Sequence, residues 1–498
     1  MKTQILYHFV VTFLFLSFFA VAKVDAQITT SLFTVNHNGD TNDANVGDNI
    51  CADSDGKCTL RAAIQEANTS PYQDGVNFAL PMPSTIDLTL GELPITSNIY
   101  IAGPGAKNLT IQRSPAEGMP NFRVFSINYT DGFVVPLTIR GLSIKNGKSN
   151  GDGGAIYINY STTVYLIDVA ITNNSAGGSG GGIFNAGRVF MTRSLVASNR
   201  NAGLFSGGII NIGPAMSVIS NSTLTNNSGN QGGAIYNTGN LLLVNNTISH
   251  NSATVGGSSI MNGSNENVSV LNTIIGMDAA SPTSSLSGAF TSLGNNLVTD
   301  ARNSTGFTNG VNGDQVSDNN AINPLLGALA DNGGQSDTRA LLSGSPAINH
   351  GNNCVHDGGC AQPVPQGFNL FTDQRLKYSR GGGTSVDVGA FESDAFTFNG
   401  YFGLGSVSFR NRSGGALLIL TEGGTNKKQT RITNPFGNFL FVNLEIGEAY
   451  FLERKPKRAM ERSGLTIFSL DNLPTLQPPT ELKREEELKF TIFDKTDK

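Results

Sequence analysis

The sequence predicts an all-β fold, a right-handed parallel β-helix, on the basis of two regularities. Five times, a glycine-rich turn leads to an asparagine, at steps of 26, 26, 26 and 25 residues, and an isoleucine two or three places earlier keeps the same register. A second asparagine series repeats between these positions. Self-similarity with a period of about 20–50 residues is typical of solenoids, and the Ile-, Val- and Thr-rich repeats favour strands over helices. The first series is Asn159, Asn185, Asn211, Asn237 and Asn262, the isoleucines are Ile156, Ile183, Ile209, Ile235 and Ile260, and the second series is Asn174, Asn199, Asn227 and Asn251.

A coil of this length with short strands and Gly/Asn corners fits a β-helix, in which strands of successive coils pair about 4.8 Å apart. Equivalent side chains then stack, and a buried asparagine can hydrogen-bond to the copies above and below it. We therefore expect the first asparagine series to form a ladder, and residues 85–390 to form about 12 coils. A flexible Gly/Ser/Asn linker is the alternative, but a linker would not hold isoleucine in register.

The N-terminus has the pattern of an export signal. Lys2 precedes an apolar stretch from Phe9 to Ala22, and small residues stand before Ala26, where signal peptidase would cut. The stretch is shorter than the ~20 apolar residues of a membrane span. We expect an exported, monomeric protein, extracellular or at the cell surface, with no transmembrane segment in the mature chain.

Charge indicates a domain boundary near residue 396. Residues 27–396 carry 16 basic and 25 acidic side chains, a net charge of −9, whereas residues 397–498 carry 15 basic and 12 acidic ones, a net charge of +3. The body has no basic stripe, which excludes nucleic acid as a partner. The predicted parts are a signal peptide (1–26), an N-terminal cap (27–84), the β-helix with its terminal cap (85–395), a small β-sandwich (397–480) and a charged tail (481–498).

Four cysteines form two close pairs, Cys51 with Cys58 and Cys354 with Cys360. In an exported chain an even number of cysteines favours disulfides, here within each pair. A zinc site is the alternative, but neither pair has C-x-x-C spacing, and the pairs lie some 300 residues apart.

The first pair leads into an amphipathic segment, Leu60 to Ala67, for which Thr59 is a suitable N-cap. A short helix here would hide the apolar end of a β-helix. The acidic run from Asp53 to Gly56 suggests calcium, but an EF-hand needs a carboxylate where Ile64 stands. We expect a disulfide-closed turn instead, with no metal and no cofactor.

Two parts of the chain resemble known families of exported bacterial proteins. Cys58-Thr-Leu-Arg-Ala-Ala-Ile-Gln-Glu-Ala-Asn68 resembles the CSLREA motif, although Thr59 and Ala62 depart from it. The resemblance implies a pectin-lyase-like β-helix at a bacterial surface, closed before a variable C-terminal module, and says little about chemistry. Four further segments look like the end of a choice-of-anchor Q domain, and these are Ser345–Asn349, Cys354, Asp373–Arg375 and Asp387–Glu392.

The last hundred residues contain short apolar runs at regular spacing, which predict a small β-sandwich. Thr433-Asn-Pro-Phe-Gly437 and Gly447-Glu-Ala-Tyr450 are similar to turns of carboxypeptidase-regulatory-like modules, and this resemblance implies a module without catalytic residues. The runs are 407–409, 417–420, 430–432, 439–442 and 450–452.

The distribution of acids argues against catalysis. Glycoside hydrolysis needs two carboxylates about 5–10 Å apart, and elimination needs a base, often with acidic calcium ligands. Residues 169–265 contain no Asp or Glu, and their one histidine, His250, is expected on the surface or beside an asparagine ladder. We predict no catalytic residues and a non-catalytic scaffold for adhesion or glycan binding, whose partner is a cell-surface glycan or protein. The alternative is a lyase or glycoside hydrolase of acidic polysaccharides.

Two sets of charged residues keep the lyase or hydrolase alternative open. The first could assemble in the N-terminal coils, and the second is expected to form a buried ion-pair cluster in the terminal cap. Because the chain has no tryptophan and 11 tyrosines, we expect limited stacking on sugar rings. The groups are Asp152, Asp168, Arg188 and Arg193, and Asp373, Arg375 and Asp387.

Overall fold

The structure is a computed structural model of residues 1–498. It describes residues 31–128, 137–263, 267–277, 282–365, 368, 370–376, 380 and 385–393, together with the backbone of β1 (Gln27–Thr29) and of the C-terminal strands β38 to β44. The predicted signal peptide lies outside these residues. Among them, no helix is long and apolar enough to span a membrane.

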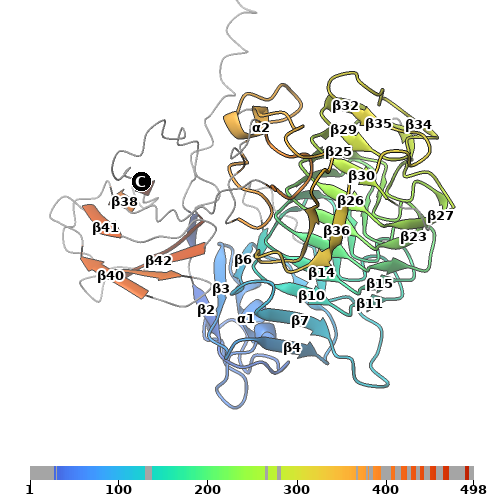
Figure 1. Ribbon diagram of the computed structural model, residues 1–498. Coiled ribbons are helices and arrows are strands. Elements are labelled where there is room, and N and C mark those ends of the chain that lie inside the picture. Colours follow the sequence, from blue (N-terminus) through green and yellow to red (C-terminus); the bar gives the residue numbers. More distant parts are fainter. Residues whose placement is uncertain are drawn as a thin grey trace, which may run out of the picture.

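The predicted fold class is confirmed: the body is a parallel β-solenoid, in which each coil adds one strand to each of several sheets (Figure 1). A representative coil runs through β12, β13, β14 and β15 before β16 begins the next. Sheet I contains β2 (Leu32–Val35), β3 (Asp74–Phe78), β6 (Ile99–Ala102), β9 (Leu137–Arg140), β13 (Thr163–Ile167), β17 (Arg188–Thr192), β21 (Met216–Ser220), β25 (Asn240–Val244), β29 (Val268–Leu271) and β32 (Thr291–Gly294).

The other three parallel sheets of the solenoid are as follows. Sheet II contains β4 (Ser84–Leu88), β7 (Leu109–Arg113), β10 (Ser143–Lys145), β14 (Ala170–Thr172), β18 (Leu195–Ala197), β22 (Thr223–Thr225), β26 (Thr247–Ser249), β30 (Ile274–Gly276), β33 (Leu297–Val298) and β35 (Gln315–Val316). Sheet III contains β5 (Leu93–Ile95), β8 (Phe125–Ile127), β12 (Ile156–Ile158), β16 (Ile183–Asn185), β20 (Ile209–Asn211), β24 (Ile235–Asn237), β28 (Ile260–Asn262), β31 (Leu286–Ala289) and β34 (Ser304–Thr305). The short sheet IV contains β11 (Lys148–Ser149), β15 (Ser175–Ala176), β19 (Arg200–Asn201), β23 (Ser228–Gln231) and β27 (Ser252–Gly256).

The core is a set of aliphatic rows that run along the solenoid axis. The isoleucine series of the sequence repeat, from Ile156 to Ile260, is paired residue by residue in sheet III and is buried throughout. Because neighbouring side chains in a strand point to opposite faces, the residue after each isoleucine faces outward. Asparagines repeatedly occupy the left-handed corner after the strands of sheet II, at Asn146, Asn173 and Asn226, a conformation that asparagine tolerates better than most residues.

The N-terminal boundary differs from the prediction. The helix α1 (Leu60–Ala67) has the predicted bounds and begins at Thr59, whose hydroxyl accepts the N–H of Ala62. However, β2 and β3 already pair in parallel in sheet I, so the coils begin within the segment that we predicted as a separate cap. Composition did not reveal this, because an edge strand in the first coil has the same alternating pattern as a strand in a cap.

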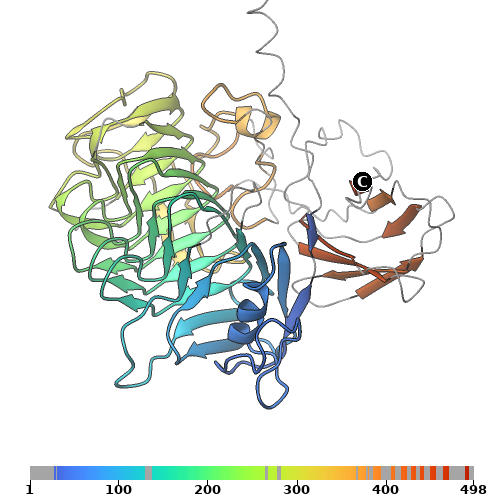
Figure 2. The same cartoon turned by 180° about the vertical axis from the view of Figure 1, so that it is seen from behind.

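The C-terminal boundary also differs. After β35 the described residues add no further coil, and the chain runs back along the outside of the solenoid as the return segment, residues 320–393, drawn in orange (Figures 1 and 2). It contains the hairpin β36 (Leu326–Ala330) and β37 (Thr338–Leu341) and the helix α2 (Cys354–Asp357). Sheet I therefore has ten strands between Leu32 and Gly294, in place of the 12 coils expected over residues 85–390.

The C-terminal strands form two sheets with mostly antiparallel pairing. Their order is β1-β43-β42-β39-β40 and β41-β38-β44, and β1 pairs antiparallel with β43. Because β44 pairs with β38, part of the segment that we predicted as a charged tail is a strand. The bounds are β38 (Gly405–Phe409), β39 (Leu417–Glu422), β40 (Lys428–Ile432), β41 (Asn438–Phe441), β42 (Ala449–Lys455), β43 (Gly464–Ser469) and β44 (Leu488–Ile492).

The glycine corners between sheets IV and III allow coils to approach more closely than a side chain permits. A Cβ atom at Gly207 would lie 2.2 Å from the carbonyl oxygen of Ser228 in the next coil. We predict that Gly207→Ala lowers the free energy of unfolding by about 3 kcal/mol, because backbone must move to make room. Gly151→Ala is the control, since its nearest neighbours would lie 3.9 Å away. Urea unfolding of both variants tests this, and equal losses would contradict it.

Candidate functional site

The first asparagine series forms a buried hydrogen-bonded ladder along sheet III. The side-chain amide of Asn185 donates to the Oδ1 of Asn211 (2.8 Å), Asn211 donates to Asn237 (2.7 Å), and Asn237 donates to Asn262 (3.1 Å). At the end of the ladder, the side-chain amide of Asn262 donates to the backbone carbonyl of Ala289 (2.7 Å). All four side chains are buried, so their polar groups are paired inside the protein and hold successive coils together.

Asn159, which we predicted as the first rung, lies outside this ladder. β12 ends at Ile158, and Ile158 pairs with Asn185, so an apolar side chain occupies the rung. Asn159 is one residue further along, partly exposed, and its Oδ1 accepts the N–H of Tyr160 (2.9 Å). The sequence carried the signal, because Ile156 stands three residues before Asn159 whereas the later isoleucines stand two residues before their asparagines.

The second asparagine series forms another buried ladder at the corner between sheets II and IV. Asn174 donates to Asn199 (2.9 Å), Asn199 to Asn227 (3.0 Å), and Asn227 to Asn251 (3.1 Å). The Oδ1 atoms of Asn199, Asn227 and Asn251 also accept backbone N–H groups from the coil before. Both ladders therefore serve the architecture.

We predict that Asn211→Ala lowers the free energy of unfolding by about 3 kcal/mol. The substitution leaves the amide of Asn185 and the Oδ1 of Asn237 without this partner, and each buried polar group left unpaired costs about 1–3 kcal/mol. Asn159→Ala, outside the ladder, should change stability by less than about 0.5 kcal/mol. Chemical denaturation measures both, and a loss at Asn159 as large as that at Asn211 would refute the assignment of the rungs.

The segment from Cys58 to Asn68 holds the first coils together. Cys51 and Cys58 form a disulfide beside α1, as Cys354 and Cys360 do beside α2, and the structure contains no free cysteine. Arg61 binds Asp40 through two hydrogen bonds, from Nε (2.6 Å) and Nη2 (3.1 Å). Nη1 also donates to the carbonyl of Glu92, and Nη2 to that of Gly91.

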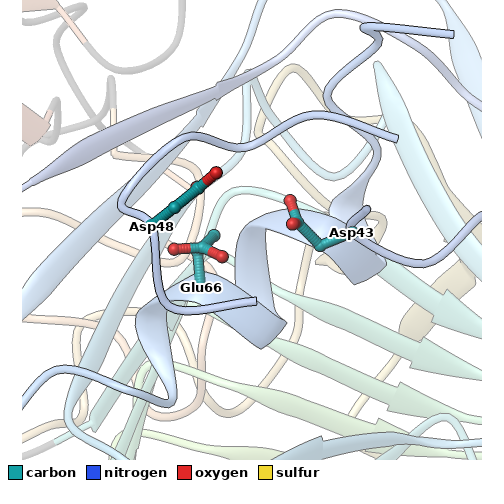
Figure 3. Close-up of side chains that lie close together, drawn as sticks. All are labelled: Asp43, Asp48 and Glu66. Atoms are coloured by element: carbon teal, nitrogen blue, oxygen red, sulfur yellow. The ribbon is translucent and has the colours of Figure 1, made fainter. Parts of the chain in front are cut away.

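Three acids that the sequence did not single out gather at this cap (Figure 3): Asp43, Asp48 and Glu66. Both oxygens of buried Glu66 accept backbone N–H groups, from Gly47 (2.7 Å) and Asn49 (2.8 Å). Asp43 likewise accepts backbone N–H groups with each oxygen, and Asp48 does so with Oδ1. These carboxylates fix the loop before α1 by accepting its backbone N–H groups.

The run considered for calcium is a closed turn. Oδ1 of Asp53 accepts the N–H groups of Asp55 and Lys57, and Oδ2 accepts the hydroxyl of Thr41. The hydroxyl of Thr41 is the largest influence that lowers the pKa of Asp53 below its ordinary value. The carboxylate therefore stays ionised as the centre of this turn.

We predict that Arg61→Ala lowers the free energy of unfolding by about 3–5 kcal/mol, because it leaves Asp40 buried and without its counter-charge. Lys57→Ala is the matched control, since Lys57 pairs with Asp55 at an exposed position and should cost at most about 1 kcal/mol. Thermal unfolding compares the two. Similar small shifts would show that the Arg61–Asp40 pair does not anchor the cap.

The charged residues of the N-terminal coils form a buried cluster only in part. Asp168 accepts hydrogen bonds from Arg193 (Nε, 2.8 Å) and from Arg140 (Nη2, 3.3 Å), and all three side chains are buried. Arg140 was not anticipated. Asp152 and Arg188 take no part in this cluster, and Arg188 is exposed at the start of β17. With its carboxylate enclosed by two guanidinium groups, the cluster has no face open to a substrate.

The ion pairs of the return segment also differ from the prediction. Arg375 pairs with Asp373 (2.6 Å), as expected, but Asp387 accepts backbone N–H groups of Asn349 and Ser393 instead of joining them. Arg380, which no sequence pattern indicated, is fully buried and pairs with Glu392 (3.2 Å). Burial raises the pKa of Glu392 to about 7, against the opposing effect of Arg380.

His250 occupies the left-handed corner position before Asn251, half-buried beneath the return segment. Burial, and secondarily the charge of Arg339, lowers the pKa of His250 to about 4. The imidazole is therefore neutral over the physiological range, and Arg339 donates to the neighbouring Thr225 and Asn226.

The return segment covers the outer faces of two sheets. Leu329 of its hairpin packs on sheet II against Ala170, Leu195 and Ala197. Farther along, Val355, Val364 and Val386 pack on sheet I, where their neighbours are Val218, Leu242, Val244 and Leu271. The protein's own chain thus occupies these faces at β14 and β18 of sheet II and at β21, β25 and β29 of sheet I.

The outer face of sheet III carries a row of stacked side chains, three of which are aromatic. Strand pairing places Ser126, Tyr157, Phe184, Ile210, Tyr236 and Met261 one above another. Tyr157 stacks on Phe184 with ring centroids 5.0 Å apart, Arg123 lies over the Tyr157 ring at 5.0 Å, and Phe205 packs against Tyr236. Tyr157, Phe205 and Tyr236 are partly exposed. Because the faces of Tyr157 are covered by its neighbours, the row offers ring edges and hydroxyl groups to a ligand.

A scan against models of protein families found no match, and a search of curated proteins found none either. A search of solved structures found the crystal structure of pectate lyase Pel9A, with a TM-score of 0.34 and 14% identity, covering 74% of this chain and 98% of that chain. The strand pairing described above defines the present chain as a parallel β-solenoid.

Proposed function

We propose that this chain is an exported, non-catalytic scaffold that binds a glycan or a surface protein through the outer face of sheet III. The observation that carries the proposal is the row from Ser126 to Met261, which contains neither a carboxylate nor an imidazole. A polysaccharide lying along this row would meet no acid or base on the row itself, and Glu92, which lies beside Arg123, is paired with that guanidinium (3.6 Å).

The state of the charged residues elsewhere supports a non-catalytic role. Asp168, Asp373 and Glu392 are buried and paired with arginines. A general acid or base must reach the bond that it protonates, and enclosed carboxylates do not. Burying such groups in ion pairs instead fixes the positions of the segments that carry them.

The family resemblances fit this proposal. In the CSLREA-like segment, Cys58 and Arg61 tie the cap together, which is an architectural role. Asp373 and Glu392, in the segments similar to a choice-of-anchor Q domain, close the return segment on itself. We propose membership of these families, cleavage of a signal peptide after Ala26, and a carboxypeptidase-regulatory-like C-terminal module through which the protein docks at a bacterial surface.

Glycan contacts would come from hydrogen bonds more than from ring stacking. Tyr157 and Tyr236 present hydroxyl groups three coils apart, and Arg123 adds a guanidinium beside Tyr157. Burial raises the pKa of Tyr236 above its ordinary value, so its hydroxyl remains protonated and able to donate at neutral pH.

We predict that the double variant Tyr157→Ala/Tyr236→Ala binds the preferred polymer at least about tenfold more weakly, as expected for two contacts of about 1 kcal/mol each. The measurement is affinity electrophoresis of the purified mature protein on pectin, alginate, xylan and cellulose derivatives. Tyr72→Ala is the control, because Tyr72 is 59% exposed and is not part of the paired row of sheet III.

The same samples separate the two candidate activities. Retention of polymer without new chain ends supports the scaffold, whereas release of unsaturated or reducing ends by the wild type identifies a lyase or hydrolase and overturns the proposal. Equal binding by the wild type and the double variant would place the binding face elsewhere.

A further inference from the structure

Arg339, on the hairpin β36–β37, is a buried cation without a counter-charge. The residue is 6% exposed, and in the part of the chain that the structure describes no carboxylate forms an ion pair with it. The strands of sheet II that it faces lie in the stretch 169–265, which contains no acid. Burying a charge without a partner is costly, so this arginine differs from the other buried arginines of the described residues, each of which pairs with a carboxylate. These are Arg61, Arg140, Arg193, Arg375 and Arg380.

The guanidinium of Arg339 joins the hairpin to one corner of the solenoid and keeps donors to spare. Nε donates to the hydroxyl of Thr225 (2.9 Å), and Nη2 donates to Oδ1 of Asn226 (3.3 Å). Nη1 donates to the carbonyl of Gly327 on the hairpin itself (3.1 Å). All three acceptors are neutral. Because a guanidinium has five N–H groups, these bonds leave one N–H on each terminal nitrogen without a partner among the described residues.

The equivalent corner of the next coil holds two buried polar atoms without partners. Strand pairing places Ser249 next to Thr225 in sheet II, and His250 has the left-handed corner conformation that Asn226 has one coil before. Oγ of Ser249 and Nδ1 of His250 are buried and make no hydrogen bond with a described residue, and Ser249 as a whole is fully buried. Since adjacent strands lie about 4.8 Å apart, both atoms lie about one strand spacing from the groups that hold Arg339.

The groups that meet at this corner can all donate hydrogen bonds. The spare N–H groups of Arg339 only donate, the hydroxyl of Ser249 has a proton, and a neutral imidazole donates from one ring nitrogen. Burial, and secondarily the charge of Arg339, lowers the pKa of His250 to about 4, so the arginine is the single cation here at neutral pH. Leu329, which pairs with Arg339 in the hairpin, packs on Ala197 and closes the corner on the side of the preceding coil.

We propose that Arg339, Ser249 and His250 bind a chloride ion between the hairpin and the corner that follows sheet II. Chloride has one negative charge, which matches the single guanidinium, and as a sphere it accepts hydrogen bonds from several directions. A phosphate carries about −1.5 to −2 charges at neutral pH and would need a second cation, which the described residues of this corner do not provide. The ion would tie the return segment to two successive coils. It lies at sheet II, so its binding is independent of the function proposed for sheet III.

Anomalous diffraction locates the ion in the intact mature protein. Crystals grown with sodium bromide in place of sodium chloride should show an anomalous peak at hydrogen-bonding distance from the guanidinium of Arg339 and from Oγ of Ser249. Bromide peaks confined to exposed arginines and surface backbone amides, with none at Arg339, would overturn the proposal.

Urea unfolding measures the same ion in solution. An ion that binds the folded chain alone lowers the unfolding equilibrium constant about tenfold for each tenfold rise of its concentration above its dissociation constant. Raising chloride from about 50 to about 500 mM should therefore lower the unfolding constant of the wild type roughly 5–10-fold. Sodium gluconate keeps the ionic strength constant, because its bulky anion does not fit an enclosed corner.

Three variants assign the effect to this corner. Arg339→Gln removes the cation and should abolish the dependence on chloride, and Ser249→Ala removes one donor and should shift the dependence to higher chloride concentrations. Arg188→Gln is the control, because Arg188 is exposed at the start of β17 in sheet I, and it should behave as the wild type does. A wild type that is insensitive to chloride, or an Arg339→Gln variant that keeps the full dependence, excludes the site. If Arg339→Gln does not fold, the bromide map of the wild type still decides.

Discussion

This structure depends on one constraint: equivalent residues of successive coils stack directly on one another, one strand spacing apart. Backbone pairing between coils brings the same residue of each repeat into contact with its copies, so a polar residue can be buried only if its copies satisfy it. Asparagine meets this requirement because its amide donates in one direction along the axis and its carbonyl accepts from the other. The two ladders from Asn185 and from Asn174 are the result.

The same constraint explains where charges occur. An ionised side chain cannot repeat along an inner row without repelling its copies, and residues 169–265 contain no acid at all. Buried ion pairs occur instead at Arg61–Asp40, at Asp168 with Arg140 and Arg193, and at Arg380–Glu392.

The return segment covers parts of the outer faces of sheets I and II, which leaves less of the solenoid surface free to bind other molecules. Val386 and Leu329 of this segment pack on sheets I and II, whereas Tyr157 and Tyr236 on sheet III are partly exposed. Sheet III is therefore the face on which we propose binding.

The sequence by itself determined the solenoid, its register and the helix from Leu60 to Ala67, because these depend on periodic local patterns that each repeat carries. It indicated the cysteine pairs, since their spacing is short. It misplaced Asn159 by one residue, because strand pairing, and not the nearest asparagine, decides the rung. Only the tertiary structure decided that the chain turns back after β35 and that Arg380 meets both Asn221 and Glu392, since contacts between residues some 160 positions apart leave no periodic trace in the sequence.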